Sequence, residues 1–193
     1  MHIIPDHHKK GKKPKDFRDR KLIFIDLEMT GSDPAIHEII EVGWLVVDGR
    51  SYKILSEYEA KVRPEHLYTA DKEGLRVAGY SENKWKKPKD LKFILNKLAK
   101  VAPNAMLAGW SVFADWQFLE RGFEKFKIKP KFNYRLLVVD SVAYAKLYKE
   151  KKLTNFSMRT GVAKLLNIPY SVEHGALKDA KLSYEVFKKL MEL

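Results

Sequence analysis

The chain has 193 residues, 45% of them hydrophobic, which is enough for one domain with a substantial core and short for two. Its 37 Lys and Arg against 25 Asp and Glu give a formal net charge of +12, which favours a polyanionic partner but equally fits a surface that only keeps a protein soluble. The absence of cysteine excludes disulfides, thiol nucleophiles and Cys-ligated zinc. The sequence has no signal-like start and no run of roughly 20 apolar residues, so a soluble, cytoplasmic protein without a membrane partner is predicted.

Residues 1–20 lack apolar periodicity, and five lysines cluster around Gly11 and Pro14. This composition predicts a disordered basic arm, followed by one folded domain over residues 21–193. The arm is interpreted as a short solvated tail, with phosphate binding or a localisation signal as alternatives.

The domain opens with three predicted strands. They are Leu22 to Ile25, Ile39 to Val47 and Tyr52 to Val62, and Gly49 provides the turn between the second and the third. After Asp90 the apolar residues recur at helical spacing, and helices then alternate with strands. The predicted elements are a helix at Leu91 to Val101, a strand at Ala105 to Ala108, a helix around Phe118 to Phe126, a strand at Leu136 to Val139, a helix capped by Ser141 that runs to about Tyr148, and two helices marked by Met158 to Leu166 and Leu182 to Leu190.

This order predicts an α/β fold in which a three-stranded antiparallel meander and two parallel strands form a mixed five-stranded sheet flanked by helices. The function must then be argued from sites, because many chemistries share such sheets.

Acidic residues inside apolar runs are the candidates for chemistry, because a buried carboxylate is costly without a partner or a metal. Asp26 and Glu28 stand two residues apart on a predicted strand, so their side chains share one face, while Leu27 points to the other. A pair of exposed acids at a strand end is the alternative.

Three further residues follow predicted strands or begin helices. Asp115 stands at the start of a helix, where capping alone also explains an acid. His174 lies in a loop, and Asp179 in the first turns of the last helix, beside the face that packs on the sheet. An isolated loop histidine is usually just exposed, so the joint occurrence of these residues carries the argument.

Four converging carboxylates repel one another unless divalent cations lie among them, and Mg²⁺ and Mn²⁺ prefer carboxylate oxygen. Two such ions about 4 Å apart hold the attacking and leaving oxygens of a phosphodiester. A neutral imidazole nearby can take the proton from water.

These residues lie in three motifs that resemble the DEDD superfamily of 3′→5′ exonucleases, in its histidine-containing branch of ribonuclease H-like fold. Residues 24–34, FIDLEMTGSDP, resemble the first motif of oligoribonucleases, and residues 108–119, AGWSVFADWQFL, are similar to their second. Residues 174–180, HGALKDA, resemble the third motif of the proofreading subunit of bacterial DNA polymerase III. The resemblance runs from about Lys21 to the C-terminus.

The resemblance implies two Mg²⁺ or Mn²⁺ ions as cofactors and His174 as the general base, five residues before the last aspartate. The implied metal ligands, which are also catalytic residues, are Asp26, Glu28, Asp115 and Asp179. Relatives are often dimers, so a homodimer is compatible with the resemblance.

Candidate substrate contacts follow from the same motifs. Met29 and Thr30 come directly after the first motif's glutamate, with a core methionine and a turn threonine as the alternative. Trp110 and Phe113 are candidates for base stacking, or for core packing. Oligoribonucleases usually have asparagine at position 110, and the proofreading enzymes have Asn and Phe at 111 and 114, so this departure concerns substrate preference rather than catalysis. The full set of candidate substrate contacts is Leu27, Met29, Thr30, Trp110, Ser111, Phe113 and His174.

The sequence therefore predicts a 3′→5′ exonuclease that hydrolyses single-stranded RNA or DNA to nucleoside 5′-monophosphates. A nucleic-acid-binding module without turnover is the alternative from another class, and a nonspecific endonuclease is a third.

Overall fold

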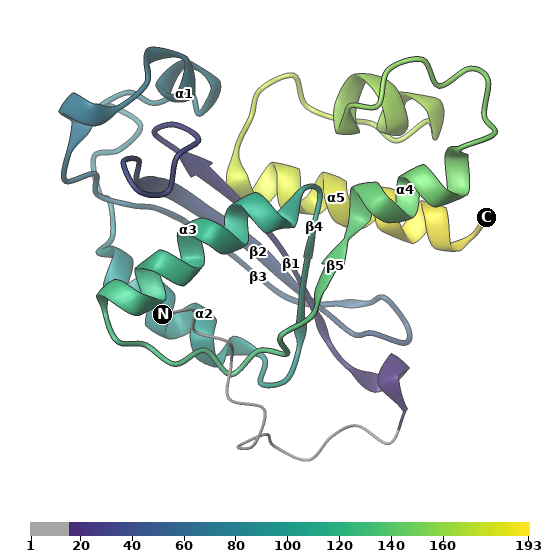
Figure 1. Ribbon diagram of the computed structural model, residues 1–193, viewed down its shortest axis with the longest axis horizontal. Helices are drawn as coiled ribbons and strands as arrows, with labels where there is room; N and C mark the ends of the chain where they lie inside the picture. The colour runs from purple at the N-terminus through teal and green to yellow at the C-terminus, as the bar shows by residue number, and fades with distance from the viewer. Residues whose placement is uncertain (1–15) are drawn as a thin grey trace.

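The sheet of the structure, a computed structural model that describes residues 16–193, has five strands in the order β3-β2-β1-β4-β5 (Figure 1). The first three, β1 (Leu22–Met29), β2 (Ile39–Val47) and β3 (Ile54–Lys61), pair antiparallel, whereas β4 (Met106–Gly109) and β5 (Leu136–Val138) continue the sheet in parallel from β1. The predicted fold class is confirmed.

The helices follow the predicted order with different ends. The longer helices are α2 (Leu91–Val101), α3 (Val112–Lys125), α4 (Val139–Leu147) and α5 (Ala176–Met191). Met158–Ala163 forms a π-helix, η3. The prediction that Ser141 caps α4 is wrong, because β5 runs directly into the helix and Val138 precedes its first residue. The short α1 (Lys72–Val77) and the 3₁₀ helix η2 (Leu67–Thr69) lie in a segment without apolar periodicity and were not predicted.

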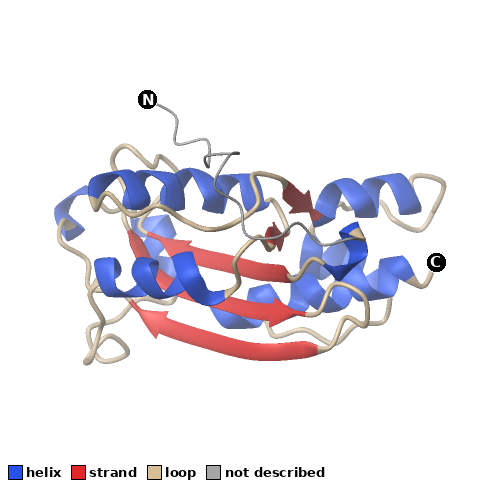
Figure 2. Ribbon diagram, turned by 90° about the horizontal axis from the view of Figure 1, so that it is seen from below, coloured by secondary structure: helices blue, strands red, loops and turns tan. Residues whose placement is uncertain are grey.

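The alternation of side chains along β1 separates two cores. Ile23, Ile25 and Leu27 pack on the face covered by α2 and α3. Leu22 and Phe24 pack on the opposite face, among residues of α4 and α5. Figure 2 shows helices both in front of the strands and behind them. Asp26 and Glu28 continue this second face, because the strand period is two residues. The apolar first half of β1 thus anchors the strand, and its second half presents two acids beside α5.

Gly43 of β2 allows the start of α5 to lie directly on the sheet. It pairs with Asp26 across β1 and β2, and a Cβ atom built on it would lie 2.1 Å from the backbone nitrogen of Leu177 and 2.3 Å from the carbonyl carbon of Ala176. Backbone atoms cannot move aside as a flexible side chain can. A residue without a side chain here therefore fixes how closely α5, and with it Asp179, approaches β1.

The ends of the chain add two observations. Residues 1–15 of the predicted arm lie outside the described residues, and Phe17–Asp19 form a 3₁₀ helix, η1, flanked by contacts from Arg50 to Asp16 and Asp19. The domain boundary at residue 21 stays a prediction. Over residues 16–193, no helix is long and apolar enough to cross a membrane, and the cytoplasmic location stays a prediction.

We expect Gly43→Ala to lower the free energy of unfolding by about 1–3 kcal/mol, because the added methyl group forces α5 away from the sheet. Chemical denaturation followed by far-UV circular dichroism measures the change. Gly175→Ala is the matched control, since a Cβ there would meet only Lys178, at an ordinary contact distance of 3.6 Å. Equal stability of both variants would contradict this role of Gly43.

Candidate active site

The two acids of β1 lie at the end of the strand that borders α5. Glu28 is 6% exposed and Asp26 is partly buried. On the neighbouring strand Glu41 stands opposite Glu28 and forms an ion pair with Lys61. The alternative of an exposed acid pair is therefore wrong, and the reason is the packing of α5 over this end of the sheet.

Asp115 reaches β1 from the first turn of α3. Its Oδ1 accepts a hydrogen bond of 2.9 Å from the backbone N–H of Leu27, the residue between Asp26 and Glu28. The side chain is 5% exposed. Asp115 thus does more than stabilise a helix terminus: it joins α3 to the strand that carries the other two acids.

The turn that delivers α3 is itself held in an uncommon conformation. Ser111, between β4 and α3, has a φ of +52°, and its backbone N–H donates a hydrogen bond of 3.2 Å to Asp140 Oδ1 in the first turn of α4. Left-handed conformations are disfavoured for residues with a Cβ unless their surroundings hold them. Asp140 provides part of that restraint.

Asp179 lies one turn into α5 and has two partners. His174 Nδ1 is 3.2 Å from Asp179 Oδ2, and the Arg159 guanidinium forms an ion pair with Oδ1. Arg159 also donates to the carbonyl oxygens of Ser171, at 2.7 Å, and Val172, at 3.0 Å. One arginine, whose side chain is 12% exposed, therefore holds both the carboxylate and the loop that leads to His174.

The pKa values of three of the four acids reflect their burial and their proximity to other carboxylates. Burial raises the pKa of Asp26 well above its usual range, and the nearby carboxylates, Asp115 first, raise it further. Burial likewise raises the pKa of Glu28 to about 8, with added repulsion from Asp179 and Glu41. Burial raises the pKa of Asp115 to about 7, although its hydrogen bond from Leu27 opposes the change. Each raised pKa means that the charged carboxylate is disfavoured unless a further cation lies nearby.

The donor set fits a divalent cation. Ligand atoms of Glu28, His174 and Asp179 lie within 4.8 Å of one another, and Glu28 Oε1 is buried without a hydrogen-bond partner among the described residues. Carboxylate oxygens are the ligands that Mg²⁺ and Mn²⁺ prefer. A second, more exposed group at Glu38 is already engaged, because its carboxylate accepts backbone hydrogen bonds from Glu65 and His66.

A cleft of about 520 Å³ opens beside His174, between the loop before α5 and the segment around α1. Its lining includes four cations and three acids, Glu41, Glu59 and Glu173. The cations are Lys61, Arg76, Lys84 and Lys178. The carboxylate cluster is thus bordered by an open surface on which positive side chains outnumber acids by four to three.

The candidate substrate contacts differ in their exposure. The side chain of Leu27 packs in the core, and that of Thr30 is fully buried and accepts a hydrogen bond from the N–H of Glu38, so neither side chain is open to a substrate. Their backbone N–H groups are engaged as well, that of Leu27 by Asp115 and that of Thr30 by the carbonyl oxygen of Glu38. Met29 is half-buried against the core. Trp110 is half-buried beside Phe156, and Phe113 is 59% exposed and therefore not a core residue.

Comparison with known proteins identifies the family. The model of the exonuclease family represented by RNase T matches residues 23–187. The chain therefore belongs to the exonuclease family, which confirms the resemblance predicted from the three motifs.

Individual relatives agree with this assignment. The chain is 29% identical over 153 residues to the oligoribonuclease of Aliivibrio fischeri, covering 72% of this chain and 82% of the relative. It is 24% identical over 177 residues to the PolC-type DNA polymerase III of Thermotoga maritima, covering 92% of this chain but only 12% of that much longer protein. The fold matches E. coli exonuclease I, solved with a dT13 oligonucleotide, with a TM-score of 0.76 at 16% identity over 90% of this chain and 41% of that one. The predicted ribonuclease H-like fold is thereby confirmed.

The raised carboxyl pKa values predict how stability depends on pH without metal. Between the ordinary carboxyl pKa, about 4, and the raised values near 7 and 8, the folded protein holds protons that the unfolded chain has released, so stability falls as the pH rises through this window. In the variant Glu28→Gln the side chain at this position cannot ionise. In EDTA, its melting temperature relative to that of the unmodified protein should therefore rise as the pH is raised from about 5 to about 8. A constant difference between the two proteins would contradict the raised pKa of Glu28.

The ion pair between Arg159 and Asp179 predicts a second stability effect. Arg159→Met leaves a buried carboxylate without its cation and should lower the free energy of unfolding in EDTA by about 3 kcal/mol. Saturating Mn²⁺ should recover part of this loss, because a bound cation compensates the same charge. Arg76→Met is the matched control, since Arg76 and Glu73 are 72% and 70% exposed, and it should cost no more than about 0.5 kcal/mol. Equal losses in the two variants would refute this account of Arg159.

Proposed function

We propose that the chain hydrolyses single-stranded nucleic acid from its 3′ end and releases nucleoside 5′-monophosphates. The observation that carries the proposal is the convergence of four carboxyl groups and one imidazole from β1, α3 and the start of α5, with burial that disfavours the charged forms of Asp26, Glu28 and Asp115. Membership of the exonuclease family supports the same reaction class.

Four residues would hold two divalent ions, Mg²⁺ or Mn²⁺: Asp26, Glu28, Asp115 and Asp179. Such ions, when bound, position and polarise the oxygens of the phosphodiester that is cleaved. Asp115 has one oxygen engaged by the Leu27 N–H, which fixes its rotamer and leaves the other oxygen for a ligand. The burial of the set costs less once cations share the space, so the metal and the fold support one another.

His174 is the proposed general base. Its Nδ1 faces Asp179, so the carboxylate orients the ring and directs the opposite nitrogen, Nε2, away from the helix. In the reaction, a water oxygen forms the new bond to phosphorus and one water proton passes to the imidazole. The 3′ oxygen of the neighbouring nucleotide on the 5′ side leaves with the electron pair of the broken P–O bond and takes a proton from solvent. At 43% exposure the His174 side chain is open to substrate and to exchange of that proton with solvent.

The substrate is a single-stranded 3′ end of RNA or DNA. The formal charge of +12 and the cations of the cleft beside His174 suit a polyanion. One relative is named an oligoribonuclease, and exonuclease I was solved with a dT13 oligonucleotide, which supports a nucleic-acid substrate. Met29 and Phe113 are the proposed side-chain contacts near the terminal nucleotide, since both are at least partly exposed. The homodimer stays a prediction.

The direct test uses single-stranded RNA and DNA oligonucleotides labelled at the 5′ end, with Mg²⁺, Mn²⁺ or EDTA, and separates the products on a sequencing gel. We expect a metal-dependent ladder that shortens from the 3′ end, and the relative rates rank RNA against DNA. Intact oligonucleotides with retarded migration in a native gel would favour a binding module without turnover. Cleavage of a circular strand would favour an endonuclease.

Variants of the site give the quantitative prediction. Asp26→Asn and Asp179→Asn should reduce mononucleotide release below detection while far-UV circular dichroism stays unchanged. His174→Ala should lower kcat by roughly a hundredfold to ten-thousandfold, the range of general-base catalysis, with a smaller effect on metal binding. Glu124→Gln, an exposed acid on the same helix as Asp115, is the matched control. A folded Asp26→Asn protein with full turnover would refute the assignment.

A further inference from the structure

Four aromatic rings form a continuous row from the turn after β4 to the end of α4. Trp110 and Phe156 have ring centroids 5.6 Å apart, Phe156 and Tyr144 are 5.9 Å apart, and Tyr144 and Tyr148 are 5.5 Å apart. Tyr144 lies on α4, and Tyr148, four residues further, is its C-cap with helical backbone angles, so the two rings lie on one side of the helix. We refer to Trp110, Phe156, Tyr144 and Tyr148 as the aromatic row.

Most of this row is open to solvent. Tyr148 is 71% exposed, Tyr144 57% and Phe156 42%, whereas Trp110 packs against the core between the sheet and α5. Exposed large rings in a contiguous set are uncommon on a protein surface without a binding role. The half-buried tryptophan anchors the row, and the other three rings are open to solvent.

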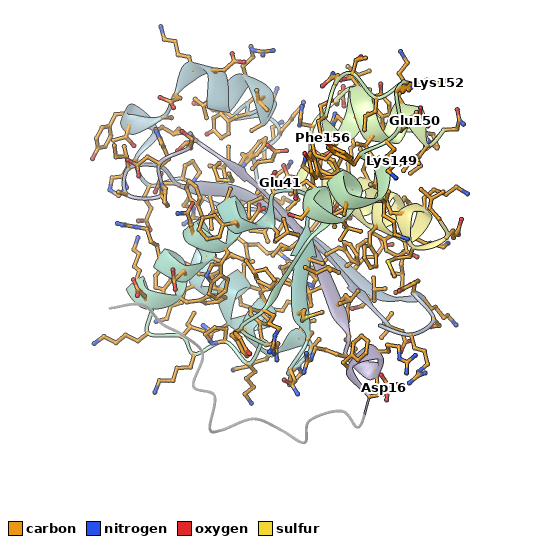
Figure 3. The ribbon with its side chains drawn as sticks, turned by 45° about the vertical axis from the view of Figure 1, so that its right-hand side comes forward. Asp16, Glu41, Lys149, Glu150, Lys152 and Phe156 are labelled. Carbon is orange, nitrogen blue, oxygen red and sulfur yellow. The ribbon has the colours of Figure 1, made fainter. Side chains whose placement is uncertain are left out.

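Positive side chains accompany the row. Lys149, Lys151 and Lys152 follow Tyr148 directly, and all three are exposed. Figure 3 labels Lys149 and Lys152 at the same corner of the molecule as Phe156. The one acid among them, Glu150, accepts the backbone N–H of Lys152 at 3.0 Å, so its carboxylate is occupied in the local turn. The corner therefore combines aromatic rings with an excess of positive charge.

The row also begins beside the candidate active site. Trp110 directly precedes Ser111, in the turn that delivers Asp115 to β1. Phe156 stands three residues before Arg159, whose guanidinium pairs with Asp179. The rings thus lead from two elements of the carboxylate cluster outward to the end of α4.

We propose that the aromatic row and the three lysines bind the nucleotides on the 5′ side of the scissile phosphate in a single strand of RNA or DNA. This inference rests on the proposed exonuclease function and adds that the enzyme holds strands longer than a dinucleotide. Aromatic rings stack on any base, and lysines attract phosphates without reading sequence, so the surface binds single strands with little sequence preference. A duplex offers no free base faces and is not held in this way.

Equilibrium binding without metal tests the surface separately from catalysis. Fluorescence anisotropy in EDTA gives the Kd of a labelled dodecanucleotide and of a dinucleotide for the full chain. We expect Tyr144→Ala and Tyr148→Ala to weaken dodecanucleotide binding by roughly tenfold each and dinucleotide binding much less. Changing Lys149, Lys151 and Lys152 to Gln should flatten the slope of log Kd against log salt by about 0.7 for each phosphate that a lysine no longer neutralises. Phe93→Ala on α2, where the ring is 58% exposed, is the matched control and should bind as the unmodified protein does.

The outcomes separate the two proposals. If the unmodified protein degrades oligonucleotides with metal but the tyrosine and lysine variants bind the dodecanucleotide as tightly as it does, the surface inference is refuted and the exonuclease stands. If the dodecanucleotide is not bound at all in EDTA, the surface inference is likewise refuted. If binding weakens as expected but no protein releases mononucleotides in Mg²⁺ or Mn²⁺, the exonuclease proposal fails and the single-strand surface remains. If the tyrosine and lysine variants bind nucleic acid as the unmodified protein does, the aromatic row would be a contact for a protein partner instead, which contradicts our assignment.

Discussion

Repulsion among buried carboxyl groups is the constraint on which this structure depends. Burial raises the pKa values of Asp26, Glu28 and Asp115, and neighbouring carboxylates raise those of Asp26 and Glu28 further. The protein supplies partial compensation, through the Arg159 pair with Asp179 and the Leu27 N–H that Asp115 accepts. Among the residues described, Glu28 Oε1 is buried and has no hydrogen-bond partner. An arrangement that costs folding free energy and leaves an acceptor unpaired is typical of a site whose ligand carries positive charge.

The rest of the fold serves to bring these groups together. An antiparallel neighbour, β2, supplies Gly43, whose missing side chain lets the first turn of α5 lie on the sheet opposite Asp26. A parallel neighbour, β4, leads through the strained Ser111 into α3. Each contributing segment is held by a contact with another, so the site depends on the packing of the whole sheet. The aromatic row extends this arrangement outward, from the site to a surface suited to a flexible polyanion.

The sequence predicted most of this because the relevant signals are local. The period of two in β1 placed Asp26 and Glu28 on one face, and the motif spacing joined His174 to Asp179. Arg159 could not be found in this way, since it lies in a π-helix, whose i→i+5 register differs from the α-helical period, and its partner is twenty residues further along the chain. Gly43 stood in an apolar strand run, and only the position of α5 explains it. Asp140 likewise accepts the hydrogen bond of Ser111 across 29 residues of sequence, a contact that no local sequence pattern predicts.

The measurement that tests the account most directly counts bound metal. Titration of the full chain with Mn²⁺, followed by the electron paramagnetic resonance signal of the free ion, gives the number of sites and their affinities. We predict two sites near pH 8, weaker binding near pH 5.5 because the carboxyls are then protonated, and loss of binding in Asp26→Asn. The claim that these buried acids form a metal site would be contradicted if Mn²⁺ bound at neither pH. It would also be contradicted if Asp26→Asn left Mn²⁺ binding unchanged.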